Sequence, residues 1–210
     1  MNRREHVILF AVAIFGLIAV LATTSLDLML AERMRELPGV LRRPLLHLTE
    51  LGKSEYYLVP TLILFLVFMY RRQMQRAAIA LYVFSCIAVS GLIVNLLKFV
   101  VGRARPKEWF ENGAYGFDAL TLESRWHSFP SGHANTMTAF VISLLPFIPA
   151  AWRAPLIIWA GAVMSTRAIL SAHYLSDILG GVLVACLTCY VVENFVRQRF
   201  GRPFDPLSPA

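Results

Sequence analysis

Long uncharged apolar runs, each ended by basic residues, constrain this chain more than any other feature of its sequence. Residues 7–26 form the first run, and residues 77–97 form another. A helix of about 20 apolar residues crosses the roughly 30 Å hydrocarbon core of a bilayer. Hydrophobic residues make up 57% of the chain and charged residues only 16%, a balance that is unusual for a soluble domain. The sequence therefore predicts an all-α integral membrane protein.

Six transmembrane helices are expected, in a single membrane domain over residues 1–200 followed by a short polar tail, 201–210. The expected spans are residues 7–26, 56–70, 77–97, 131–152, 156–167 and 174–196. A short turn that holds Arg153 and Pro155 would separate the fourth span from the fifth. A signal peptide is the competing interpretation of the first run, and residues 23–26 make a poor cleavage site for one.

Two stretches between the spans are mixed in character. Residues 27–55 mix charged and apolar side chains, which predicts an interfacial amphipathic segment, broken near Pro38-Gly39 and near Pro44. Residues 107–129 are polar and aromatic and contain two glycines, which indicates a loop outside the membrane. This loop is long enough to act as a lid.

The even number of spans places both termini on one side of the membrane. The ends of spans three and five and the starts of spans four and six then meet at the opposite face. Nine of the 20 Lys and Arg residues fall on the terminal side and eleven on the other. Four of the eleven, Lys98, Arg103, Arg105 and Arg167, converge with other polar residues at the ends of these spans. Setting these four aside favours cytoplasmic termini and a site at the periplasmic, outer face of a bacterial inner membrane.

Residues 167–177 place a cation, an imidazole and a carboxylate in an otherwise apolar setting. If the chain is helical from Tyr174, then His173 and Asp177 share a face. The carboxylate can then accept a hydrogen bond from one ring nitrogen and leave the other free. Such an imidazole is a candidate nucleophile or base. A buried ion pair that only fixes helix packing explains these two residues equally well.

Three cations, Lys98, Arg105 and Arg167, together with backbone N–H groups at the start of span four, describe a receptor for a tetrahedral dianion. Residues 130–133, with the sequence Pro-Ser-Gly-His, would open the fourth helix, where free N–H groups and the helix dipole favour phosphate. Taken alone, this tetrapeptide is better explained as a plain turn before a helix.

The spacing of the motifs together resembles the signature of the type 2 phosphatidic acid phosphatase superfamily, which also includes the vanadium haloperoxidases. The three motifs are Lys98-x6-Arg105-Pro106, Pro130-Ser131-Gly132-His133 and Arg167-x5-His173-x3-Asp177. The third motif of the family commonly starts Ser-Arg. Here it starts Thr166-Arg167, which keeps a hydroxyl group.

The resemblance implies a role for each residue. His173 would attack phosphorus and form a phosphohistidine, Asp177 would hold the tautomer of His173, and His133 would protonate the leaving group and then activate water. The transition-state oxygens would be held by Lys98, Arg105, Ser131, Gly132 and Arg167. Arg103 is a further possible contact of the substrate. No metal or other cofactor is needed, because fixed cations stabilise the charge.

The implied activity is hydrolysis of a lipid phosphomonoester or pyrophosphate at the bilayer surface. Undecaprenyl pyrophosphate, phosphatidylglycerophosphate, phosphatidic acid and a lipid A phosphate are all compatible with the site. Phosphotransfer to another lipid is an alternative that the sequence does not separate from hydrolysis. An anion or lipid transporter would have charged or broken segments at mid-membrane depth, whereas here the polar residues cluster at one end. The net charge of +7 suits lipid headgroups rather than nucleic acid, because the basic residues flank apolar runs.

Overall fold

The computed structural model describes residues 13–14, 16–18, 21 and 24–200, and within them the fold is helical with no strand. The helices are η1 (Thr24–Leu26), α2 (Asp27–Arg35), α3 (Gly39–Glu50), α4 (Glu55–Tyr70), α5 (Met74–Val101), α6 (Pro106–Asn112), η2 (Ser124–Trp126), α7 (Gly132–Leu144), η3 (Leu145–Phe147), α8 (Ala150–Ile169) and α9 (Leu175–Phe200). The prediction of an all-α fold is confirmed.

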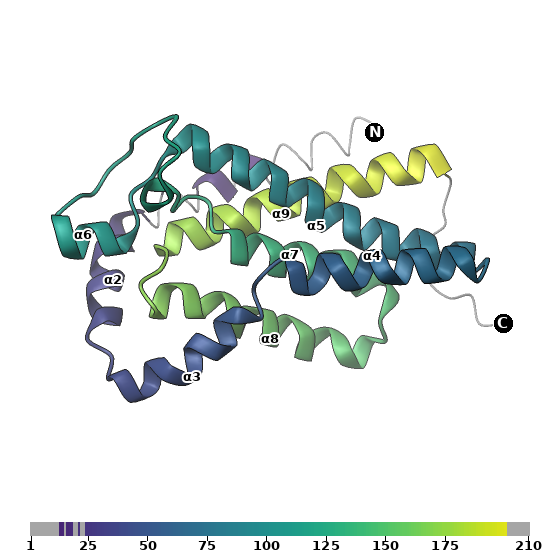
Figure 1. The fold of residues 1–210 in the computed structure, drawn as a ribbon, viewed down its shortest axis with the longest axis horizontal. Helices are drawn as coiled ribbons and strands as arrows, with labels where there is room; N and C mark the ends of the chain where they lie inside the picture. Colours follow the sequence, from purple (N-terminus) through teal and green to yellow (C-terminus); the bar gives the residue numbers. More distant parts are fainter. Residues whose placement is uncertain (1–12, 15, 19–20, 22–23, 201–210) are drawn as a thin grey trace.

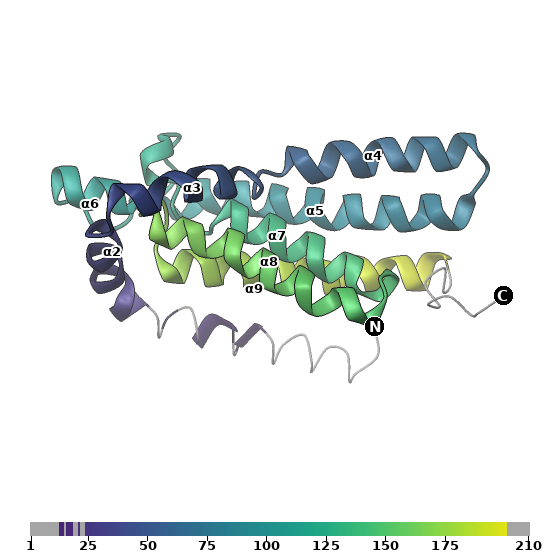
Figure 2. The ribbon, with the colours of Figure 1, turned by 90° about the horizontal axis from the view of Figure 1, so that it is seen from below.

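The long helices α4, α5, α7, α8 and α9 run along one axis as a bundle (Figures 1 and 2). Helix α7 lies at its centre and contacts α5, α8 and α9, while α4 packs on α5. Small side chains on α7, such as Ala134 and Ala139, are fully buried. Such residues let helix backbones approach closely, which is how helices pack when lipid rather than water surrounds them.

Among the described residues, three segments are long and apolar enough to cross a membrane: residues 39–70, which hold α3 and α4, residues 74–101 and residues 175–196. The outward faces of the bundle are apolar as well. Leu92 on α5 is 70% exposed, and Ile158 on α8 is 71% exposed. Apolar faces of this extent suit lipid rather than water, and the chain is a multi-pass membrane protein. The predicted first span, residues 7–26, falls mostly outside the described residues.

The turn between the fourth and fifth predicted spans lies earlier than expected. Arg153 and Pro155 are inside the first two turns of α8, so the prediction of a turn there is wrong. The chain turns instead at residues 145–149, which include Pro146 and Pro149. Proline has no N–H to donate and pushes the residue before it toward an extended conformation, which Ile148 adopts. Two prolines so close together end one helix and start the next.

The segment 27–55 is broken at Pro38, between α2 and α3, and again at residues 51–54, between α3 and α4. The second predicted break, at Pro44, is wrong, because α3 continues through it. Proline removes one helical hydrogen bond, and this loss is offset by the packing of α3 on α8. Arg42 on α3 also donates a hydrogen bond to the carbonyl of Leu170, just after α8, at 3.1 Å.

One end of the bundle gathers the end of α5, the start of α7, the end of α8 and the start of α9, with α2 and α6 beside them (Figure 1). Backbone hydrogen bonds join these segments. The N–H of Ser131 donates to the carbonyl of Asp177 at 2.9 Å, and the N–H of Ser128 donates to the carbonyl of Arg103 at 3.0 Å. The segments that carry the three motifs therefore meet in space.

Candidate active site

His173 lies in the short connection between α8 and α9 and is only 3% exposed. Its backbone N–H donates to the carbonyl of Arg167 at 3.1 Å. Its ring Nδ1 lies 2.8 Å from the carbonyl oxygen of Ser128. A carbonyl oxygen can only accept, so Nδ1 carries the proton and Nε2 keeps a free lone pair. Burial lowers the pKa of His173 to about 4, so the ring is neutral at neutral pH.

Asp177 does not make the hydrogen bond to His173 that its spacing predicts. The carboxylate oxygen Oδ2 is 3.6 Å from Nδ1 of His173. It accepts instead from the hydroxyl of Ser128 at 2.5 Å and from the N–H of Tyr174 at 2.8 Å. Tyr174 is the residue before α9 and Asp177 is the third residue of that helix, a position from which a carboxylate commonly reaches back to cap the helix. Asp177 thus acts on His173 as a nearby charge.

Arg103 is 4% exposed and lies between two buried carboxylates. Its Nη1 is 2.6 Å from Oδ1 of Asp177, and its Nη2 is 2.7 Å from Oδ2 of Asp27. The guanidinium also lies over the ring of Tyr174, 4.5 Å from its centroid. Burial alone would lower the pKa of Arg103, but the two carboxylates together raise it above its ordinary value. Arg103, Asp27 and Asp177 thus form a buried ion network.

Asp27 is the residue that the sequence analysis missed. It is fully buried at the start of α2, and it accepts hydrogen bonds from the backbone N–H of Ser176 at 3.0 Å and from the hydroxyl of Ser176. Burying a carboxylate at the end of an apolar run costs free energy unless the carboxylate is paired. The position of Asp27 in the sequence could therefore have indicated a buried cationic partner. Ser128 and Ser176 carry no such signal, because serine is common in loops and near helix starts.

The predicted phosphate-binding residues surround the start of α7. Ser131 caps this helix, with its hydroxyl 3.5 Å from the N–H of Ala134. A Cβ atom on Gly132 would lie 3.4 Å from Nζ of Lys98, so backbone and ammonium are adjacent. Arg105 and Arg167 are both close enough to Lys98 to repel its charge.

The two arginines are held by different parts of the chain. Arg105 donates to the carbonyl oxygens of Ser124 and His127, at 3.0 and 3.2 Å, and burial lowers its pKa. Arg167 donates through Nη1 to the hydroxyl of Thr49 at 2.8 Å. Its buried Nε has no hydrogen-bond partner within the described part of the chain, so one donor is available to a ligand.

His133, the other predicted catalytic histidine, follows Gly132 on α7. Its ring packs against Gly52, where an added Cβ atom would lie 2.5 Å from the ring carbon Cδ2. Arg167, Lys98 and His173 all lie near this ring. Two imidazoles and three cations thus gather at one end of the bundle, which is an arrangement suited to phosphoryl transfer.

The family model of the PAP2 superfamily matches residues 79–200. The chain belongs to the PAP2 superfamily. The matched region contains all three motifs, and the resemblance seen in the sequence is confirmed.

Curated relatives of this PAP2 chain include two bacterial lipid phosphatases. Over 107 residues it is 37% identical to the lipid A 1-phosphatase of Rhizobium etli, covering 50% of the chain and 44% of that protein. Over 100 residues it is 32% identical to phosphatidylglycerophosphatase B of Bacillus subtilis, covering 42% of the chain and 48% of that protein. The chain therefore spans less than half the length of either relative.

A solved PAP2 structure shares the fold. It is the crystal structure of a transmembrane PAP2-type phosphatidylglycerolphosphate phosphatase from Bacillus subtilis, with a TM-score of 0.61 and 20% sequence identity. The alignment covers 91% of this chain and 98% of the other. At this identity the likeness shows the helical architecture of the bundle.

Substitution of Gly181 by Ala is expected to disturb the candidate site by displacing α9 from the start of α7. A Cβ atom there would lie 2.4 Å from the carbonyl oxygen of Ser131, so α9 must move away from the start of α7. We expect a lower melting temperature in detergent and weaker phosphate binding. Gly161→Ala on α8 is the matched control, because nothing lies within 4 Å of an added Cβ atom, and alanine favours a helix by about 1 kcal/mol. Equal melting temperatures for the two variants would contradict this expectation.

Proposed function

We propose that the chain is a membrane lipid phosphatase that works through a covalent phosphohistidine on His173. The observation that carries this proposal is the hydrogen bond from Nδ1 to the carbonyl of Ser128. It fixes the tautomer in which Nε2 is a nucleophile at neutral pH. The cations Lys98, Arg105 and Arg167 would hold the phosphate beside it, with Ser131 and Gly132 at the start of α7.

In the first step, Nε2 of His173 attacks phosphorus and the bond from phosphorus to the lipid oxygen breaks. His133 donates a proton to the departing oxygen, which leaves as a lipid alcohol or, from a pyrophosphate, as a lipid phosphate. The positive charge that develops on the ring of His173 is stabilised by Asp177, 3.6 Å from Nδ1. The three cations stabilise the charge on the transferring phosphoryl oxygens.

In the second step, His133 takes a proton from a water molecule, and the resulting hydroxide attacks the phosphohistidine. The bond from phosphorus to Nε2 breaks, inorganic phosphate leaves, and His173 returns to its neutral form. Fixed cations stabilise the charge in both steps, so the scheme requires no metal ion.

We also propose which segments of the chain cross the membrane. Six spans would be residues 7–26, α4, α5, α7 continued by η3, α8 and α9, in one domain over residues 1–200 with 201–210 as a tail. The 13 residues of α7 and three of η3 give a length of about 26 Å, close to the thickness of a hydrocarbon core. Helices α2 and α3 would lie at the interface. The Lys and Arg distribution supports cytoplasmic termini and a periplasmic site.

The test of this function is phosphate release from detergent-solubilised phosphatidic acid, phosphatidylglycerophosphate, undecaprenyl pyrophosphate and a lipid A phosphate. We expect release from at least one of these lipids, with the same rate in excess chelator, because the chain's own cations replace a metal. Membranes that lack the protein are the control. Release that requires added Mg²⁺ would contradict the mechanism, and no loss of phosphate from any lipid would contradict the function.

The same assay separates hydrolysis from phosphotransfer. With a donor labelled in its phosphate, hydrolysis yields labelled inorganic phosphate, whereas transfer to a second lipid yields a labelled lipid. We expect the label in inorganic phosphate, because water is the acceptor in the second step.

A further inference from the structure

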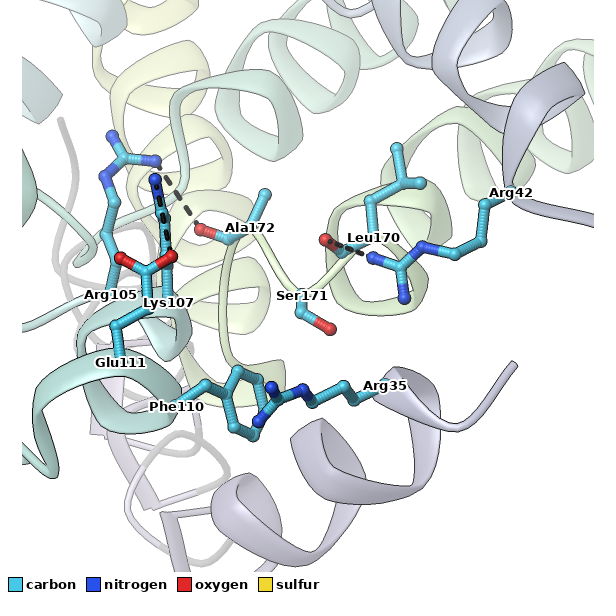
Figure 3. Close-up of a pocket in the computed structure, with 9 residues that line it drawn as sticks. All are labelled: Arg35, Arg42, Arg105, Lys107, Phe110, Glu111, Leu170, Ser171 and Ala172. Atoms are coloured by element: carbon cyan, nitrogen blue, oxygen red, sulfur yellow. Dashed lines mark hydrogen bonds and ion pairs between the residues drawn. The ribbon is translucent and has the colours of Figure 1, made fainter. Parts of the chain in front are cut away.

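A cationic cavity adjoins the candidate active site. It has a volume of about 450 Å³ and lies between α2, α3, α6 and the connection from α8 to α9 (Figure 3). This volume is within the range of roughly 300–1,000 Å³ that is typical of ligand pockets. Four cations line it, Arg35, Arg42, Arg105 and Lys107, with a single carboxylate, Glu111.

The positive charge of this cavity is largely uncompensated. Lys107 and Glu111 are 3.6 Å apart but more than half exposed, so this pair contributes little. Arg42 and Arg105 donate only to carbonyl oxygens, which carry no net charge. Arg35 lies over the ring of Phe110 at 4.6 Å. Within the described residues, none of the three arginines has a carboxylate within ion-pair distance.

An unsatisfied hydroxyl also lies here. Ser171 lines the cavity, and its buried hydroxyl oxygen has no hydrogen-bond partner among residues 24–200. Figure 3 shows its side chain between the Arg42 side and the Arg105 side of the cavity. Guanidinium groups beside a hydroxyl form a set of donors that suits phosphate oxygens. The occupant indicated by this chemistry is a phosphate-type anion.

Only a short connecting segment separates the cavity from the candidate catalytic residues. Residues 170–172 form one of its walls, and they connect Arg167 at the end of α8 to His173. Arg105 belongs to both places, because it lines the cavity and acts on Lys98. An anion in the cavity would therefore lie beside a phosphate held at His173, within reach of one lipid headgroup.

We infer that this cavity binds a second phosphate of the same substrate lipid. The preferred substrates would then carry, besides the phosphate that is removed, another phosphate or phosphodiester in the headgroup. This inference rests on the proposed phosphatase function and narrows its substrate class.

The experiment compares two lipids on one preparation of the full-length protein. Phosphatidic acid carries one phosphate, and phosphatidylglycerophosphate carries a terminal phosphate and a phosphodiester. In the double variant Arg35→Gln, Lys107→Gln, we expect the ratio of kcat/KM for phosphatidylglycerophosphate to that for phosphatidic acid to fall at least ten-fold, mainly through KM. The ratio does not depend on how much of the preparation is folded, because both lipids meet the same enzyme.

The matched control is Arg71→Gln, Arg72→Gln, which removes the same charge from the exposed turn at the other end of the bundle. We expect this control to keep the ratio of the unaltered protein. A ratio that stays constant in the cavity variant would overturn the inference while leaving the phosphatase function intact. Hydrolysis of neither lipid by the unaltered protein would overturn the inference. The phosphatase function would be contradicted as well only if undecaprenyl pyrophosphate and the lipid A phosphate also released no phosphate.

A further arm distinguishes a second phosphate of the substrate from a separate anion. Phosphatidylglycerol or inorganic phosphate is added to the assay with phosphatidic acid. If the cavity held a separate anion, these additions would change the rate of the unaltered protein and not that of the cavity variant, which would overturn the assignment to the same molecule. We expect the additions to affect both proteins alike.

Discussion

Replacing His173 by alanine is expected to reduce phosphate release at least about a thousand-fold, as loss of a nucleophile does in other enzymes. The substitution removes Nε2, the atom that the hydrogen bond to Ser128 leaves free to attack. The three cations remain, so binding of the lipid should change much less than kcat. The measurement is kcat and KM on the lipid that the unaltered protein hydrolyses fastest, in excess chelator.

His127→Ala is the control for this variant, because it removes an imidazole from the neighbouring loop. The Nε2 atom of His127 lies 2.9 Å from the carbonyl of Thr121, and the side chain is only partly buried. We expect its rate to stay within about two-fold of the unaltered protein, as for most substitutions away from buried features. Equal release by the His173→Ala variant and the unaltered protein would show that His173 is not the nucleophile.

Replacing Arg103 by alanine is expected to destabilise the protein by about 3–5 kcal/mol, the effect of breaking a buried ion pair. The change leaves Asp27 and Asp177 buried with no cation between them. Asp177 also caps α9 and lies beside His173, so activity should fall together with stability. The measurement is thermal unfolding in detergent, with activity assayed well below the melting temperature.

Arg125→Ala is the matched control, since it removes an arginine from an ion pair in the same loop region. Arg125 pairs with Glu123, but both side chains are more than half exposed, and such pairs contribute about 1 kcal/mol or less. A similar melting temperature for the two variants would show that the network around Arg103 does not stabilise the fold. Asp27→Asn provides an intermediate case, because it keeps the shape of the side chain and removes one charge.

The sequence was sufficient to place several of the long helices and the motifs. Apolar runs located α4, α5 and α9, because a bilayer demands long uninterrupted segments. Parity of the spans then placed Lys98, Ser131 and His173 at one end, since alternating helices must return to the same face. Both inferences depend on the whole length of a segment, and single substitutions hardly affect them.

Other features depend on which partner a side chain selects, and spacing does not decide that. His173 and Asp177 are four residues apart as expected, yet the backbone carbonyl of Ser128 competes successfully for the ring nitrogen. Asp27 was not assigned to the site, because its partner Arg103 is distant in the sequence. Pro44 was assigned to a break, although tertiary packing keeps α3 continuous around it.

The ion network around Arg103 joins three parts of the chain that are synthesised at different times. Asp27 leaves the ribosome first, Arg103 follows, and Asp177 comes last of the three, on α9. Before α9 is inserted, Arg103 has only one of its two carboxylates, and the helix that completes the charge balance also brings the residues next to His173. The position of α9 in the bundle therefore sets both the charge balance around Arg103 and the connection that holds His173.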